Sequence, residues 1–147
     1  CGGSVMGYCF MIMPYRVVWD ADNEEMVPDF ETIERPDAPD LPNSHHGRSS
    51  VHAISYGALD AWAERVGLMD LLAHDGELLQ GGHPGWVMLR PEHLMRVQQA
   101  LSAAQARATL PAGYGKGYDW DLARLVWLEW WMRYGLATWE QPILRNI

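Results

Sequence analysis

The sequence predicts an α+β protein: a small sheet of short strands packed by three or four helices, with a long acidic loop near the N-terminus. Residues 7–13 are apolar on both faces apart from Gly7, which is typical of a buried strand. Later segments carry apolar residues at helical spacing, and a stretch rich in acids and prolines separates them from this strand. That order of elements predicts a short sheet with helices on one side.

A chain of 147 residues and 16.7 kDa has the size of one domain. We expect residues 6–147 to form a single α+β domain, and residues 1–5 to be a cloning remnant ahead of Met6, the expected native start. Within the domain, the acidic and proline-rich segment 20–50 is predicted to be a loop. Cys9 lies in an apolar run and is interpreted as a small buried hydrophobe.

The first strand is expected to break at Pro14. Residues 15–19 either continue it past a bend or return as a second strand. Residues 55–76 then have helical spacing, with Ser55 as the expected N-cap, and Gly67 is a candidate break between two short helices.

Residues 86–90 predict a short strand, and Pro91 stands where the next helix should begin. Asp119 is the expected cap of a final helix that is apolar nearly all round, which is typical of a central position. Its Trp and Tyr side chains fall on one face, and Glu129 precedes Arg133 in the favourable i, i+4 order. The tail 142–147 is a candidate edge strand.

Excess negative charge is concentrated in one segment. Residues 20–40 hold nine carboxylates and a single Arg, a charge of −8, which equals the formal net charge of the whole chain. The apolar residues Val27, Phe30 and Ile33 are interleaved with these acids, as in segments that combine electrostatic attraction with a few apolar anchors. The alternative interpretation is a solvated loop that only improves solubility.

The motifs of common active sites are missing from the sequence. His45, His46 and His52 match no standard zinc spacing, and the glycine-rich stretches 81–85 and 113–118 lack a phosphate-binding signature. We therefore predict no catalytic residues, no metal and no cofactor. A Trp-rich helix could stack on bases, but base-stacking proteins pair aromatics with a basic groove and this chain is acidic, so direct nucleic-acid binding is not expected.

The sequence has no run of 18 apolar residues, so no membrane span is expected. After Met6 it also lacks a basic region followed by an apolar stretch and a cleavage site. Neither cysteine requires an oxidising compartment. Together these features predict a cytoplasmic protein.

The stretches "MGYCFMI", "GWVMLRPEHL" and "WLEWWMRYG" resemble small bacterial proteins that open with a Met-Gly-Tyr strand and end on a Trp-rich helix. The overall profile, short, acidic and Trp-rich without catalytic motifs, is also similar to immunity proteins that neutralise secreted bacterial toxins. This resemblance implies a binding function and brings no active-site residues with it.

We therefore hypothesise a cytoplasmic inhibitor of immunity type that binds a basic protein partner through its acidic surface. The predicted partner-binding residues are Asp20, Asp22, Glu24, Glu25, Asp29, Phe30, Glu31 and Glu34. One alternative is a nucleic-acid mimic, such as a phage inhibitor of a DNA-binding complex. The other is a small hydrolase that depends on the histidines.

Overall fold

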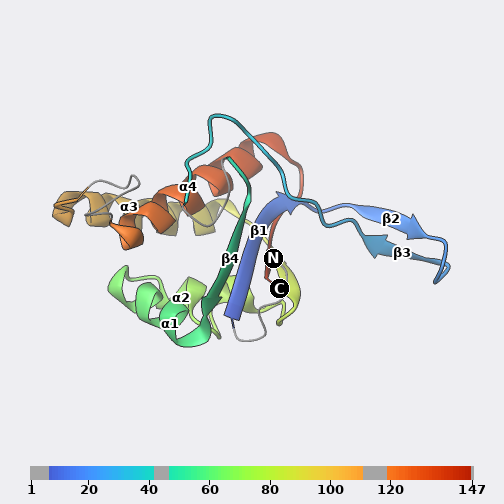
Figure 1. Ribbon diagram of the computed structural model, residues 1–147, viewed down its shortest axis with the longest axis horizontal. Helices are drawn as coiled ribbons and strands as arrows, with labels where there is room; N and C mark the ends of the chain where they lie inside the picture. Colours follow the sequence, from blue (N-terminus) through green and yellow to red (C-terminus); the bar gives the residue numbers. More distant parts are fainter. Residues whose placement is uncertain (1–6, 42–46, 111–118, 147) are drawn as a thin grey trace.

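A computed structural model describes residues 7–41, 47–110 and 119–146 of the chain. Within these residues it confirms the predicted α+β class: four antiparallel strands form one sheet, two further strands form a separate hairpin, and four α-helices accompany them (Figure 1). No helix in these three ranges is both long and apolar enough to cross a membrane.

The sheet contains β1 (Gly7–Pro14), β4 (Ser50–Ser55), β5 (Gly85–Met88) and β6 (Pro142–Asn146), in the order β4-β1-β6-β5. The C-terminal tail is therefore a strand, as predicted, but its predicted edge position is wrong. Leu144 pairs with Ile12 of β1 on one side and with Val87 of β5 on the other. β1 and β5 each form backbone hydrogen bonds with one edge of β6. The sequence of β6 alone does not show whether one or both of its edges are paired.

The sheet is covered on both faces, which explains why β1 is apolar throughout. Ile12 and Leu144 belong to the main core on the helical face, whereas Met13 and Ile143 belong to a smaller cluster on the opposite face, and all four are fully buried. Residues alternate between faces along a strand, so a strand buried on both sides needs apolar residues at every position. No helix contributes a residue to the smaller cluster.

Two short helices follow β4. The first, α1 (Tyr56–Arg65), begins at the predicted cap: the Ser55 hydroxyl accepts a hydrogen bond from the Ala58 amide at 3.2 Å. Gly67 then has a φ of +75°, a conformation that glycine adopts without strain, and it separates α1 from α2 (Met69–Leu72) as predicted. A 3₁₀ turn, η1 (Glu77–Leu79), leads towards β5.

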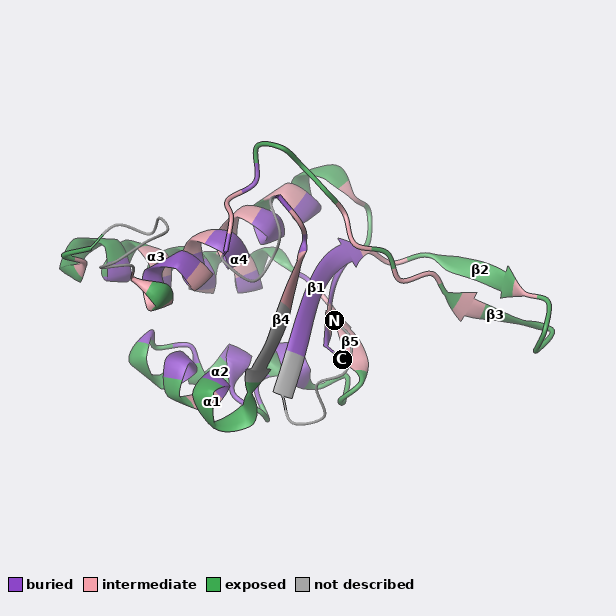
Figure 2. Ribbon diagram, viewed as in Figure 1, coloured by how far each residue is buried: buried purple, intermediate pink, exposed green. Residues whose placement is uncertain are grey.

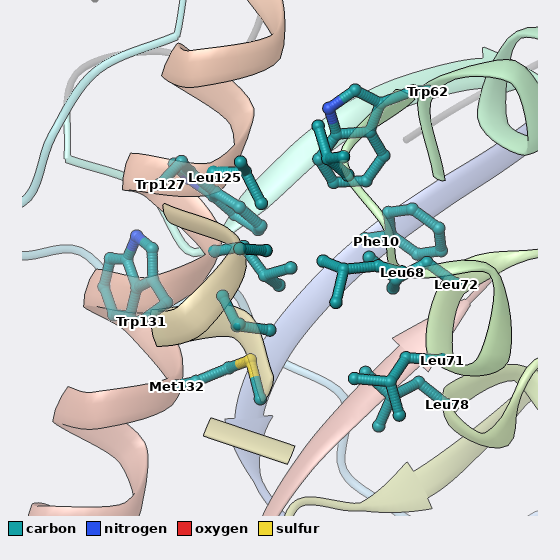
Figure 3. Packing of buried hydrophobic residues seen from close by; sticks show 14 of the residues in the cluster. Phe10, Trp62, Leu68, Leu71, Leu72, Leu78, Leu125, Trp127, Trp131 and Met132 are labelled. Carbon is teal, nitrogen blue, oxygen red and sulfur yellow. The ribbon is translucent and has the colours of Figure 1, made fainter. Parts of the chain in front are cut away.

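The two long helices are α3 (Pro91–Arg107) and α4 (Trp120–Thr138), and they pack against each other. As predicted, Asp119 caps α4 by accepting a hydrogen bond from the Leu122 amide at 2.9 Å. Trp131 is fully buried and Trp127 nearly so, which confirms the central position expected for α4. Figure 3 shows both rings in the main core cluster, which also contains Leu68, Leu71 and Leu72.

The predicted loop is wrong at its N-terminal end. Residues 17–28 form a hairpin of β2 (Val17–Asp20) and β3 (Glu25–Pro28), which neither continues β1 nor joins its sheet. Beyond it, residues 29–41 contain one isolated bridge and are held to the body where Phe30 and Ile33 pack on the core clusters. Val27, the third expected anchor, lies in the hairpin. The predicted loop residues 42–46 lie outside the described residues.

Cys9 is buried, with 2% of its surface exposed, as expected for its place in β1. Its sulfur is disulfide-bonded, however, and so it is not a free thiol.

Candidate functional site

The turn of the hairpin is fixed by Asp20. One carboxylate oxygen accepts hydrogen bonds from the amides of Asp22 and Asn23, and the other accepts one from the Asn23 side chain at 2.8 Å. The side-chain bond from Asn23, followed by the amide of Asp22, lowers the pKa of Asp20 below its usual value. Glu24 completes the turn with a φ of +53°. The chain reversal is thus held by polar contacts within the turn itself.

One face of the hairpin is apolar and exposed. Cross-strand partners lie on the same face of a two-stranded ribbon, and here the pairs are Trp19 with Met26 and Val17 with Pro28. The exposed fractions are 59% for Trp19, 57% for Met26 and 43% for Val17. None of these side chains belongs to either core cluster. The ribbon therefore presents an apolar strip with nothing of the described body covering it.

The tip of the hairpin is strongly negative. Asp20, Asp22, Glu24 and Glu25 surround the turn, and residues 17–28 contain no Lys, Arg or His. Among the described residues, no cation forms an ion pair with any of these four carboxylates. Apart from the turn contacts of Asp20, their charge faces solvent.

The hairpin projects from the body as an arm (Figure 1), and both of its strands are largely exposed along their length (Figure 2). Its base is closed by two contacts. The Asp29 amide donates to the Arg16 carbonyl at 2.8 Å, and the Arg16 guanidinium pairs with Glu31 at 2.8 Å. We call residues 17–28 the arm.

The structure divides the predicted partner-binding residues into two groups. It brings Asp20, Asp22, Glu24 and Glu25 together at the tip of the arm, and it leaves the other four at or beyond the base. Of these, Glu31 and Glu34 pair with the chain's own Arg16 and Arg48, at 2.8 and 3.3 Å. Asp29 is half-buried beside the base.

Phe30 packs partly against the body of the protein. It is half-buried against the smaller core cluster, and the Arg145 guanidinium lies 3.6 Å from its ring centre. Sequence reasoning missed the exposed apolar residues of the arm, which are Val17, Val18, Trp19 and Met26. The signal was two short apolar runs on either side of a turn sequence rich in Asp and Asn.

In the described part of the chain, the histidines do not gather into a metal site. His45, His46 and the side chain of His52 lie outside it. No three metal-ligating side chains gather among the described residues. The buried His93 has a structural contact instead: its Nδ1 accepts the Arg90 amide at 3.0 Å at the start of α3, while Nε2 meets Glu77 at 3.0 Å.

The arm thus combines a projecting shape, an exposed apolar strip and a cluster of carboxylates at its tip. The chain matches no protein-family model, and comparisons with curated proteins and with solved structures give no match either. A functional proposal therefore depends on the geometry of the arm.

Proposed function

We propose that the chain is a protein-binding inhibitor of immunity type, which neutralises a bacterial protein toxin by laying its arm on a basic surface of that toxin. The observation that carries the proposal is the arm itself: an exposed apolar strip that ends in four carboxylates without basic partners among the described residues. Soluble proteins seldom expose aligned apolar side chains on a projecting element unless something binds them.

The charge at the tip supports a basic partner. Four carboxylates within six residues create a local negative potential, which attracts a positive surface from a distance of about a Debye length, roughly 10 Å at 0.1 M salt. Such attraction mainly raises the association rate and makes it dependent on salt. The tip would therefore guide the encounter and orient the arm.

The apolar strip would supply the lasting contact. Trp is among the residues most often found to dominate binding energy, and Met adapts its shape to irregular surfaces. Trp19 and Met26 are cross-strand neighbours and expose more than half of their surface each, so a partner can cover both at once. Truncating such a central aromatic commonly weakens binding by about 2 kcal/mol or more.

Among the described strands, β2 and β3 pair only with each other, so the outer edge of each has backbone groups available for pairing. A partner strand could extend this ribbon by main-chain hydrogen bonds. The charged tip and the exposed position then limit pairing to partners whose charge is positive.

A cytoplasmic location is part of the proposal and stays a prediction. An immunity protein acting outside the cytoplasm would use the same arm.

The test reverses the charge of the tip while leaving its turn intact. Asp22, Glu24 and Glu25 are changed to Lys together, and Asp20 is kept because its carboxylate holds the turn. A matched control changes Glu64, Glu92 and Glu140 to Lys, three exposed acids elsewhere on the body that give the same change in net charge. Association with the toxin encoded by the neighbouring gene is measured at low and at physiological salt.

We expect the tip variant to lower the association rate constant at low salt by about tenfold or more, and the control to lower it much less. Trp19→Ser should instead raise the dissociation rate constant. If the tip and control variants lowered the association rate constant equally, the arm would not be part of the interface. Displacement of the chain by duplex DNA from its target would favour the nucleic-acid mimic in place of the immunity protein.

A further inference from the structure

A second feature of the molecule lies on the sheet face that no described helix covers. Here an open cleft of about 550 Å³ is bounded by one charged side chain, two aromatic rings and a tight loop. The lining residues are Phe30, Gly81, Pro84, Gly85, Trp86 and Arg145. The volume falls within the range of roughly 300–1,000 Å³ that is usual for small-molecule sites.

Arg145 is the charged residue of the cleft, and its surroundings are unusual for an arginine. It lies on the central strand β6, with Met11 and Trp86 as its cross-strand neighbours, so its stem is enclosed by apolar side chains. Its guanidinium carbon stands 3.6 Å from the centre of the Phe30 ring. A guanidinium stacked in this way leaves its N–H groups pointing outward in its own plane.

No anion of the described residues balances this charge. Arg145 forms no ion pair and no side-chain hydrogen bond with them, whereas the arginines on the helices mostly pair with a carboxylate. Burial lowers the pKa of Arg145, and no neighbouring carboxylate opposes that effect. A half-buried guanidinium with free N–H groups is complementary to a bound anion.

The loop beside Arg145 shapes the cleft through its glycines. A Cβ atom on Gly81 would collide with the backbone of Trp86, and one on Gly85 would collide with the backbone of Gly81. The two glycines thus let residues 81–85 fold tightly against the start of β5. Trp86 is held from the other side by Tyr15, whose ring centre lies 4.7 Å away. The Trp86 ring of the cleft is therefore packed against a second aromatic ring.

We propose that this cleft binds a small organic carboxylate with an apolar, ring-bearing body. The Arg145 guanidinium would hold the carboxylate through paired N–H···O bonds, and the rings of Phe30 and Trp86 would contact the body. A single arginine between aromatic walls suits a carboxylate better than a phosphate, which is usually held by several cations or by backbone amides. This site is independent of the arm and does not rest on its proposed role.

The experiment uses benzoate as the probe, with neutral benzamide as a matched compound of nearly the same shape and inorganic phosphate as an anion without an apolar body. Binding is followed by ¹H–¹⁵N NMR of the full chain, reading the amides of Gly85, Trp86 and Arg145 and the Trp86 indole. We expect saturable shifts confined to these groups with benzoate, and at least about tenfold weaker binding of benzamide and of phosphate.

Arg145→Gln removes the charge, and Arg107→Gln is the matched control, because Arg107 is exposed on α3 and does not line this cleft. We expect the first to weaken benzoate binding at least about tenfold and the second to leave it unchanged. If Arg145→Gln does not fold, as its circular dichroism would show, the comparison of benzoate with benzamide on the unmodified chain decides alone. Equal binding of benzamide, or shifts outside the cleft, would overturn the proposal; equal binding of phosphate would overturn its choice of an organic acid.

Discussion

At the scale of single residues, two tryptophans of the same helix differ in one hydrogen bond. Trp127 donates its indole N–H to the Arg48 carbonyl at 3.2 Å and so ties α4 to the segment before β4. The indole N–H of Trp131 is buried and has no acceptor among the described residues. Both rings are almost fully enclosed, with exposed fractions of 3% and 0%.

This difference predicts unequal costs for the same substitution. Trp127→Phe and Trp131→Phe remove similar apolar area, but only the first leaves a carbonyl without its donor. We expect Trp127→Phe to lower the free energy of unfolding by about 1 kcal/mol more than Trp131→Phe does. Urea unfolding of the two variants measures this difference in the free energy of unfolding. A larger loss at Trp131 would contradict this assignment of the hydrogen bond's contribution.

His74 and Asp60 form an exposed pair that responds to pH. Asp60 accepts from the His74 amide and meets its Nδ1, both at 2.9 Å. The hydrogen bond to Asp60, with the charges of Asp60 and Asp75, raises the pKa of His74 above its ordinary 6.5. The bond from the His74 amide lowers the pKa of Asp60.

A raised histidine pKa stabilises the fold at low pH and loses that effect at high pH. The contribution of His74 is fully present below its unfolded pKa near 6.5 and disappears as pH rises through the higher folded value. The difference in free energy of unfolding between the unmodified chain and His74→Ala should therefore shrink between about pH 5.5 and pH 8. Urea unfolding at the two pH values checks this, with Glu64→Gln as a control that should show no such change. A difference that grows with pH would contradict the pairing.

At the scale of elements, the arm is self-contained. Its turn is held by Asp20, its strands pair with each other and with no other described strand, and its apolar side chains add nothing to the core clusters. An isolated two-stranded hairpin is at best marginally stable in water, so its conformation depends on the Arg16–Asp29 closure at its base.

Removing the arm should leave the body folded. Replacing residues 17–28 by Asn-Gly joins Arg16 to Asp29 through a two-residue hairpin turn, which suits the hydrogen bond already present between them. We expect the free energy of unfolding to change by no more than about 1 kcal/mol, because no core contact is lost. Thermal and urea unfolding measure this change in the free energy of unfolding. The same variant should no longer bind the toxin. A body that unfolds on excision would show that the arm serves the fold instead of a partner.

At the scale of the whole molecule, local patterns predicted much of the fold. The caps Ser55 and Asp119, the break at Gly67 and the helix start at Pro91 were correct, because each depends on a few adjacent residues. The position of β6 was not predictable in the same way, since pairing with β1 and β5 joins residues far apart in the chain.

The candidate site was predicted only in part for a similar reason. The density of acids identified the tip, where Asp22, Glu24 and Glu25 are neighbours in sequence. Residues 15–19 were a candidate second strand, and β2 lies largely within them. Acids and prolines are poor strand formers, so the composition of the segment that follows concealed β3 and the strip that the two strands create. Which acids pair with the chain's own arginines depends on tertiary contacts such as Glu34 with Arg48, and the Arg145 cleft depends on three separate segments.

The central place of β6 has a consequence for biosynthesis. Ribosomes make β1, β4 and β5 first, yet β1 and β5 meet only through a strand that emerges after α4. Until then the nascent chain exposes two open strand edges and the apolar surfaces beside them, which are features that invite chaperones and aggregation. β6 is therefore the strand that joins β1 to β5, and the four-stranded sheet is complete only after translation has passed residue 146.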